Sequence, residues 1–376
     1  MRILHLAKYY WPRSGGMERV VQALAEGAEL LGHRVEVVAV REPGIGRTGG
    51  QRPRAGVTRA FSLGTFGSQE IAPGYLAHSW KRADIIHIHH PHPLADLACL
   101  LRAGRTPVVV THHADSRRGI NRPLARLILR RAAAVVVPSR AHVALSTELR
   151  GLEAKVEVIP FGIDEERWNE VPPAPADGTP RALFIGRLVR YKGVDILLRA
   201  LEQVPGLALD VVGSGPELPR LRTLARALAI EDRVRWFGEY PDDELPRRMA
   251  EAHMLVLPSV TVEEMFGLVV LEAMAAGRPV VTTAVPSAVR EVNVPGETGL
   301  EVPIRDVRAM ADALHRLATD PALRARMGAA GRRRVWDHFT RERMAAAHVT
   351  LYRRVLGEPA VAPVPFGAEI PSQSGP

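Results

Sequence analysis

Short apolar runs alternate with longer amphipathic stretches along most of the chain. The first two runs are RILHLA at 2–7 and RVEVVAV at 34–40. Between them, Val20, Leu24 and Leu31 share one face of a helical period. This order of strand, helix and strand indicates βαβ units, and therefore parallel sheets.

The alternation occurs twice, on either side of a proline-rich break. The break, EVPPAPADGTP at 170–180, lacks an apolar period and is typical of an interdomain linker. We therefore expect an α/β protein with two Rossmann-like domains, 1–169 and 181–339, that face each other across a ligand-binding cleft. The further strands that the pattern predicts are 84–88, 107–111, 133–138 and 156–160 in the first domain, and 181–186, 207–213, 233–237, 254–258 and 279–283 in the second.

Three other stretches complete this outline. Residues 41–80 are rich in Gly, Arg and Pro and predict surface loops that leave room for one short helix. Residues 340–357 predict an amphipathic helix. The last stretch, 359–376, is rich in Pro, Ala and Ser, so we expect it to be disordered.

The composition is that of an ordinary globular protein. Of 376 residues, 46% are hydrophobic and 24% are charged, and this length suits two domains. The single cysteine, Cys99, excludes a disulfide framework and a cysteine-rich metal site. The N-terminal apolar run is too short for a signal peptide, and no run approaches the ~20 apolar residues that cross a bilayer. We expect a cytoplasmic protein, at most peripheral on the inner face of the membrane.

The net charge of +9 favours anionic partners such as phosphates, anionic lipid or nucleic acid. Arginine supplies most of this charge, since lysine occurs only at positions 8, 81, 155 and 192. Lys192 therefore stands out, because it lies in a loop flanked by glycines.

The strongest motif is SVTVEEMFGLVVLEAMAAGRPVV at 259–281. A helix is expected to begin near Phe266, and its free N–H groups suit a diphosphate. Glu272, two turns along this apolar helix, could accept hydrogen bonds from the vicinal hydroxyls of a ribose. Glu264, in the preceding loop, could reach sugar hydroxyls or a developing positive charge. We favour this interpretation over a capping and a surface glutamate, because charges are rarely buried without a task.

A second motif is LFIGRLVRYKG at 183–193, where a strand leads through a glycine into a loop that opens a helix. Arg187 and Lys192, five residues apart at the carboxyl end of this strand, could hold a leaving diphosphate. Loop cations are also commonly just solvated. The scarcity of lysine favours the binding role.

Two glycine-rich turns follow other strands. Gly15 and Gly16 separate the first strand from the first helix, which allows a phosphate or sugar to approach the backbone, although turn geometry alone would also explain them. The segment GSGPE at 213–217 could pass close to a nucleotide. It does not complete a dinucleotide fingerprint, which argues against a nicotinamide site.

Histidines gather at two strand ends, in HIHHPH at 87–92 and in THHAD at 111–115. The first group lacks a cysteine, aspartate or glutamate that would complete a ligand set, so we expect no metal there. Adjacent parallel strands would bring both groups to one edge. His113 could contact a sugar hydroxyl there, or it could be a satisfied histidine at the rim.

A basic amphipathic segment, NRPLARLILRR at 121–131, separates its arginines from its leucines. Arg122, Arg126 and Arg130 form one stripe. Contact with an anionic membrane and a solvated helix face both account for this pattern.

Taken together, these segments resemble the family-4 retaining glycosyltransferases of the GT-B fold, in particular bacterial mannosyl- and hexosyltransferases of polysaccharide or glycolipid synthesis. The resemblance covers nearly the whole chain. The matching motifs, in order, are GGMER at 15–19, HIHHP at 87–91, VIPFGID at 158–164, Gly186-Arg187 with Lys192-Gly193, GSGPE at 213–217, the 264–272 segment, and GRPVV at 277–281.

The resemblance implies roles for individual residues. Gly15 and Gly16 would lie against the donor diphosphate and sugar, and Arg187 and Lys192 would bind the diphosphate. Glu264 and His113 would contact the donor sugar, and Glu272 the ribose. The other donor-binding residues implied are Gly213, Tyr240 beside the base, and the backbone of Phe266, Gly267, Leu268 and Val269. Helix 340–357 would return to the N-terminal domain.

The expected activity is metal-independent hexosyl transfer with retention, by front-side displacement, from GDP-mannose or a UDP-hexose. The partners would be this nucleotide-sugar donor and a glycan or lipid-linked acceptor, with no cofactor and no nucleic acid. Two alternatives stay open: a nucleotide-sugar 2-epimerase on the same fold, and a non-catalytic protein that binds nucleotides or polyanions.

Overall fold

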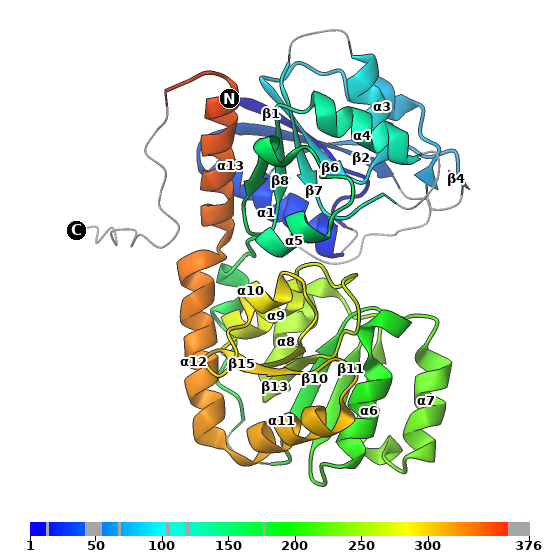
Figure 1. Ribbon diagram of the computed structural model, residues 1–376, viewed down its shortest axis with the longest axis vertical. Helices are drawn as coiled ribbons and strands as arrows, with labels where there is room; N and C mark the ends of the chain where they lie inside the picture. The colour runs from blue at the N-terminus through cyan, green and yellow to red at the C-terminus, as the bar shows by residue number, and fades with distance from the viewer. Residues whose placement is uncertain are drawn as a thin grey trace, which may run out of the picture. The chain divides into compact units, whose positions relative to one another are not determined.

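The computed structural model describes residues 1–12, 15–41, 55–66, 69–102, 106–116, 121–175 and 178–359. The chain divides into two compact units, each with a parallel sheet covered by helices (Figure 1). Unit 1 comprises Met1–Ile163 and the segment from Asp337 onward, and unit 2 comprises Asp164–Trp336.

Unit 1 contains a seven-stranded parallel sheet with the order β3-β2-β1-β6-β7-β8-β9. Its central strands are buried along their whole length, as expected for a parallel sheet covered on both faces. The strands are β1 (Arg2–Leu6), β2 (Arg34–Arg41), β3 (Gly56–Phe61), β6 (Ile85–His90), β7 (Val108–His112), β8 (Ala134–Val137) and β9 (Val156–Val158). A separate antiparallel pair consists of β4 (Thr65–Phe66) and β5 (Gln69–Glu70).

The helices of unit 1 pack on this sheet through their apolar faces. Helices α1 and α13 lie against each other, and so do α3 and α4. The helices are α1 (Gly16–Leu30), α2 (Gly74–His78), α3 (Pro93–Leu101), α4 (Asn121–Arg131), α5 (Arg140–Leu145) and α13 (Arg341–Val355), with the short 3-10 helix η1 (Glu153–Lys155).

The start of α13 is attached to the end of the VIPFGID motif. The N–H of Ile163 donates to Phe339 O, and that of Arg341 donates to Ile163 O. A Cβ atom on Gly162 would lie 2.2 Å from Thr340 O, so only glycine allows this approach. The glycine of this motif is therefore explained by packing within unit 1.

Unit 2 contains a six-stranded parallel sheet with the order β12-β11-β10-β13-β14-β15. Its strands are β10 (Arg181–Ile185), β11 (Ala208–Val212), β12 (Val234–Gly238), β13 (Met254–Leu257), β14 (Val280–Thr283) and β15 (Gly299–Val302). Its helices are α6 (Val194–Glu202), α7 (Leu218–Ala227), α8 (Leu245–Glu251), α9 (Leu268–Ala275), α10 (Val289–Val292), α11 (Val307–Thr319) and α12 (Pro321–His338), with 3-10 helices η2 (Glu166–Trp168), η3 (Arg190–Lys192), η4 (Glu231–Arg233) and η5 (Asp242–Glu244).

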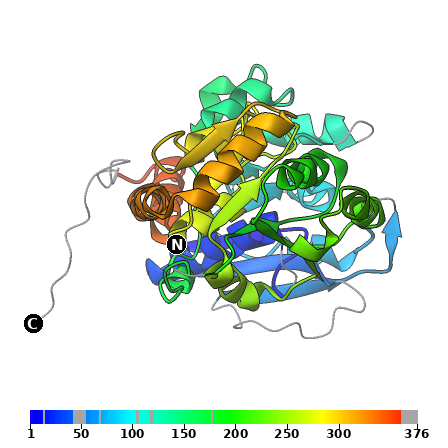
Figure 2. The same cartoon turned by 90° about the horizontal axis from the view of Figure 1, so that it is seen from below.

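Helices α11, α6 and α7 lie next to one another along one face of this sheet (Figure 2). Leu197, Leu201 and Leu314 from these helices pack with Phe184 and Val211 from the strands in one buried core. This apolar layer holds the strands in position, so the loops at their carboxyl ends start from a rigid base.

Each sheet has one point where the strand order reverses. In unit 1 the chain runs from β1 outward to β3 and then returns to β6, on the other side of β1. In unit 2 it runs from β10 outward to β12 and then returns to β13. Loops diverge above such switch points and leave room for a ligand at the carboxyl edge.

The predicted strands all occur, with ends that differ by one or two residues. The stretch 41–80 was expected to form loops with room for one short helix. It contains α2, but it also contributes the parallel strand β3, and 42–54 lie outside the described residues. The sequence GVTRAF of β3 is only partly apolar, because this strand lies at the sheet edge. The predicted disordered tail, 359–376, lies outside the described residues except for Pro359.

The predicted linker, 170–180, belongs to unit 2 in the structure, apart from 176–177, which are not described. Just before it, Trp168 is buried. The guanidinium of Arg278 donates a 2.6 Å hydrogen bond to Pro172 O and further bonds to carbonyls of Met249 and Ala276. The arginine of the GRPVV motif therefore fastens the proline-rich segment to the body of unit 2.

Among the described helices, none combines the length and the apolar character that crossing a membrane requires.

Candidate functional site

An ion pair spans the switch point of unit 2. Lys192 lies in the loop after β10, and Glu264 lies in the loop after β13. Lys192 Nζ donates to Glu264 Oε2 at 2.5 Å, and Ser259 Oγ donates to the same oxygen at 2.7 Å. Both charged side chains are about nine-tenths buried. The structure thus brings together two residues that are far apart in the sequence. Each had been predicted from its own motif to bind the ligand.

Helix α9 begins directly after this pair. Gly267 is its N-cap residue with φ of 72°, and no side chain caps the helix. Phe266, Gly267 and Val269 are buried, whereas Leu268 is half-buried. The positive end of the helix therefore lies next to the Lys192–Glu264 pair, as an anion-binding arrangement requires. Glu272, one turn into the helix, is also buried.

The loops after β10 and β11 pack backbone against backbone. Gly186 N–H donates to Val212 O, and Gly213 has a φ of 133°. A Cβ atom on Gly213 would lie 2.0 Å from Gly186 O. The glycine at 213 is therefore required for this close packing, which brings the GSGPE segment beside the loop that carries Lys192.

Two further predicted residues lie at the same edge of the sheet. The Arg187 side chain is exposed and forms no hydrogen bond or ion pair with other residues of the described chain. Tyr240, after β12, is half-buried, and its ring packs edge-on against Phe237. The Arg248 guanidinium stacks on both rings. Tyr240 thus belongs to an aromatic wall two strands away from β10.

In unit 1, the glycine turn and His113 lie at one sheet edge. Gly15 is the N-cap residue of α1 and Gly16 is its first residue, in the loop that follows β1. His113 follows β7, and β6 alone separates β1 from β7 in the sheet. The predicted unit 1 residues therefore lie together at its carboxyl edge.

His113 is the end of a chain of hydrogen-bonded imidazoles. His113 Nε2 shares a hydrogen bond of 3.1 Å with His89 Nδ1, and His89 Nε2 shares one of 3.0 Å with His5 Nδ1. The His113 ring also packs against Phe161, with centroids 5.1 Å apart. The tautomer and the orientation of His113 are thus set by residues behind it.

Helix α13 contributes two more side chains to this group of histidines. His348 stacks on His87, and Tyr352 Oη is hydrogen-bonded to His87 Nδ1. Burial lowers the pKa of His5 and of His113 to about 3, and that of His348 to about 4. The imidazoles are therefore neutral near pH 7, and the stack carries no charge.

Several residues of both regions were not identified from the sequence. Ser259 begins the 259–281 motif, but the motif gave it no role. His5, His348 and Tyr352 lie far from the two histidine-rich segments. The sequence placed His5 in the first predicted strand and gave no other signal. The structure shows that it pairs in register with His87 of the neighbouring strand. Their shared position depends on strand order and on the return of α13.

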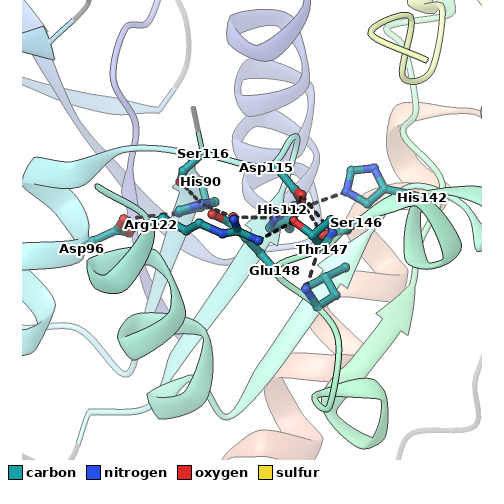
Figure 3. A network of polar contacts seen from close by, with 11 residues as sticks. His90, Asp96, His112, Asp115, Ser116, Arg122, His142, Ser146, Thr147 and Glu148 are labelled. Atoms are coloured by element: carbon teal, nitrogen blue, oxygen red, sulfur yellow. Dashed lines mark hydrogen bonds and ion pairs between the residues drawn. The ribbon is translucent and has the colours of Figure 1, made fainter. Parts of the chain in front are cut away.

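The expectation of no metal at HIHHPH depended on the absence of an acidic residue within that segment. The structure brings two acidic residues from elsewhere, Glu148 and Asp96, to His90 (Figure 3). Glu148 comes from the turn after α5, 58 residues along the chain. The motif by itself could not reveal Glu148 as a partner, because only the fold brings this residue to His90.

Comparisons with known proteins identify the family of this chain. Residues 14–167 match the family described as "Glycosyltransferase Family 4", and residues 165–334 match "Glycosyl transferases group 1". The chain is 30% identical over 366 residues to the D-rhamnosyltransferase WbpZ of Pseudomonas aeruginosa, covering 90% of this chain and 92% of that protein. The chain belongs to the group 1 glycosyltransferases.

Two further relatives support this assignment. A GDP-mannose-dependent alpha-(1-6)-phosphatidylinositol monomannoside mannosyltransferase of Mycolicibacterium smegmatis is 35% identical over 269 residues, covering 66% of this chain and 70% of that protein. The structure of sucrose-phosphate synthase from Thermosynechococcus elongatus matches with a TM-score of 0.78 and 26% identity, over 95% of this chain and 99% of that one.

The expected fold class is thereby confirmed: this glycosyltransferase has the GT-B fold, with two Rossmann-like domains. It is an enzyme that transfers a sugar, and two of its relatives are named as a rhamnosyltransferase and a phosphatidylinositol monomannoside mannosyltransferase. Neither the epimerase nor the non-catalytic alternative receives support from these relatives.

Proposed function

We propose that this glycosyltransferase moves a mannosyl or other hexosyl group from a nucleotide-sugar donor to a hydroxyl group of a glycan or lipid-linked acceptor, with retention and without a metal. The observation that carries the proposal is the Lys192–Glu264 pair at the switch point of unit 2, beside the N-terminus of α9. A lysine, a helix N-terminus and the exposed Arg187 supply positive charge where a diphosphate would otherwise need a cation.

The carboxylate of Glu264 has a second oxygen for the donor sugar. Its bonds to Lys192 and Ser259 both use Oε2, so neither occupies Oε1. In the donor complex, Oε1 would accept a hydrogen bond from a sugar hydroxyl while Lys192 binds the diphosphate. Glu272, buried one turn into α9, would accept the ribose hydroxyls, and Tyr240 would contact the base.

The reaction breaks the bond between the sugar C1 and the diphosphate oxygen, and forms a bond between C1 and the acceptor oxygen on the same face. The acceptor proton passes to a phosphate oxygen of the leaving nucleoside diphosphate. Arg187, Lys192 and the N-terminus of α9 stabilise the charge that develops on this leaving group. From unit 1, Gly15 and Gly16 would lie along the diphosphate, and neutral His113 would orient the sugar.

The donor that we propose first is GDP-mannose, because a relative of 35% identity is named for its dependence on it. A UDP-hexose is the alternative. On the acceptor side, exposed Arg122, Arg126 and Arg130 of α4 accompany Leu127, which is 54% exposed. This surface would place the enzyme on an anionic membrane where a lipid-linked acceptor lies.

The donor is tested by the thermal stability of the enzyme with GDP-mannose, UDP-glucose, UDP-galactose and UDP-N-acetylglucosamine, because a bound donor stabilises the folded state. We expect the largest increase with GDP-mannose. The product anomer is then read by NMR. An inverted anomer would contradict the retaining mechanism, and stabilisation by a UDP-sugar alone would exclude GDP-mannose.

Glu264→Gln tests the site itself. Removing this charge is expected to reduce transfer on the order of 10²-fold, as for other groups that stabilise charge in a transition state. The neighbouring Glu263 is exposed and makes no contact with Lys192, so Glu263→Gln serves as the matched control. Equal activities of the two variants would contradict the proposed role of Glu264.

A further inference from the structure

A second group of ligating side chains lies at the carboxyl edge of unit 1, apart from the His113 chain. His90 ends β6 and His112 ends β7, and the two are direct register partners. Their rings stack with centroids 5.3 Å apart. Glu148, in the turn after α5, faces both rings, and all three side chains are fully buried (Figure 3).

The three side chains direct one atom each toward a common point. His90 Nε2 lies 3.3 Å from Glu148 Oε2, and His112 Nε2 lies 3.3 Å from the same oxygen. These three atoms lie within 4.8 Å of one another. Ser116 Oγ is 3.0 Å from His90 Nε2. Two imidazole nitrogens and a carboxylate oxygen are ligands that zinc prefers.

The opposite nitrogens of both imidazoles already have partners. His90 Nδ1 faces Asp96 Oδ2 of α3 at 3.2 Å, and His112 Nδ1 shares a 2.7 Å hydrogen bond with His142 Nε2 of α5. A carboxylate or another acceptor behind a histidine is the usual support of a metal ligand, because it fixes the proton on Nδ1 and leaves Nε2 for the ion.

An ion-free arrangement is the competing explanation. Burial opposes the charged form of His90, but Asp96 and Glu148 raise the pKa of His90 to about 9, so a His90 cation could hold both carboxylates. Charged N–H···O bonds of this kind are usually about 2.7–2.9 Å long. The two separations of 3.3 Å are longer.

The spacing fits a bridging ion better. Zinc bonds of about 2.0–2.1 Å to nitrogen and oxygen in a tetrahedron place neighbouring ligand atoms roughly 3.4 Å apart. We propose that His90 Nε2, His112 Nε2 and Glu148 Oε2 bind a zinc ion, with the fourth position, beside Ser116 Oγ, taken by that hydroxyl or by water. The ion fixes the ends of β6 and β7, and this proposal does not depend on the identity of the donor.

The other histidine group at this edge does not fit a metal as well. His5, His87 and His89 also lie close together, but they include no carboxylate. Both nitrogens of His89 are engaged, by His5 and His113, and both of His87, by Tyr352 and Thr111. An ion there would have to break these hydrogen bonds, whereas an ion at His90, His112 and Glu148 keeps the bonds to Asp96 and His142.

The test uses full-length protein purified without a metal-affinity column, equilibrated with zinc and freed of loosely bound ions by gel filtration. Elemental analysis is expected to find about one zinc ion per chain in the wild type. His112→Asn and Glu148→Gln should lose it. His5→Asn dismantles the other histidine group and should retain it. A wild-type chain without zinc, or loss of zinc in His5→Asn alone, would overturn the assignment.

Asp96→Asn separates an ion site from an ion-free network. This substitution removes no ligand. Because Asp96 supports the ligand His90 from behind, its loss should weaken zinc affinity roughly 10- to 100-fold, measured by competition with a chelator. Unchanged affinity would contradict the proposed arrangement.

If the variants do not fold, the wild type is tested alone. After removal of metal with a chelator, one added equivalent of zinc should raise the melting temperature, because zinc binds only the folded site. The same melting temperature with and without zinc would overturn the proposal.

Discussion

At the switch point of unit 2, Lys192 and Glu264 face each other as an ion pair, whereas the hydrogen-bonded chain of His5, His89 and His113 in unit 1 consists of neutral imidazoles. Both regions lie at the carboxyl edge of a parallel sheet, so topology does not distinguish them. The difference lies in charge. The edge of unit 2 has a buried ion pair, whereas the hydrogen-bonded chain that ends at His113 in unit 1 stays uncharged.

This contrast fits a division of labour in sugar transfer. The leaving group is an anion whose charge grows during the reaction, so fixed positive charge is useful beside it. Sugar hydroxyls are neutral, and they are oriented by hydrogen bonds from groups whose protons are held in place. The histidine chain from His5 through His89 to His113 has the properties of such a group, because its protons are held by hydrogen bonds and it carries no charge.

The largest expected effect comes from removing the charge in unit 2. Lys192→Met should reduce kcat on the order of 10²- to 10³-fold, because the diphosphate loses a fixed cation in the transition state. Steady-state kinetics with the donor found by thermal stabilisation measures this loss. Arg190→Ala is the control, since Arg190 lies in the same 3-10 turn but is 88% exposed and pairs with Glu217. Comparable losses in both variants would mean that net charge, not the ion pair, matters.

The second effect concerns stability in unit 1. Burial lowers the pKa of His5 to about 3, while the unfolded chain binds this proton near its ordinary value of 6.5. The contribution of His5 is therefore complete above pH 6.5 and is lost as the pH falls from 6.5 toward 3. At pH 5 the loss is about 2 kcal/mol relative to pH 8.

Urea denaturation at pH 5 and pH 8 measures this difference in the free energy of unfolding. His5→Asn should reduce the difference, whereas His315→Asn, at an exposed position of α11, should leave it unchanged. If His5→Asn keeps the full pH dependence, His5 is not held neutral by the fold.

The smallest effect is expected at His113, which we propose contacts the sugar. His113→Asn should lower kcat about 10-fold, the equivalent of one hydrogen bond, with little change in the affinity for the nucleoside diphosphate. Kinetics and nucleotide-binding calorimetry separate these two quantities. His92→Asn is the control, because His92 is also buried at this edge but packs against Tyr75 instead of joining the His113 chain. A loss of nucleotide affinity in His113→Asn would contradict the neutral, orienting role.

Much of the fold follows from periodicity along the chain. Most strands of both sheets and the helix carrying Glu272 were predicted to within one or two residues, because buried parallel strands are continuous apolar runs. Strands β3 and β15 were missed, since each is an edge strand that buries only part of its surface and mixes polar and apolar residues. The ion pair between Lys192 and Glu264 was not predicted as a contact, although both residues were marked by their motifs.

By itself, the sequence determined the two series of βαβ units, the motifs at the strand ends and the family to which they belong, because these depend on local periodicity and on short stretches of chain. The tertiary structure decided which strand ends are neighbours. Strand order alone placed Lys192 against Glu264, and the return of α13 brought His348 and Tyr352 to His87. The same packing buried Glu148 against His90 and His112, which are 58 and 36 residues away in the chain. Such contacts cannot be predicted from periodicity, because neighbouring parallel strands can be separated by any length of chain.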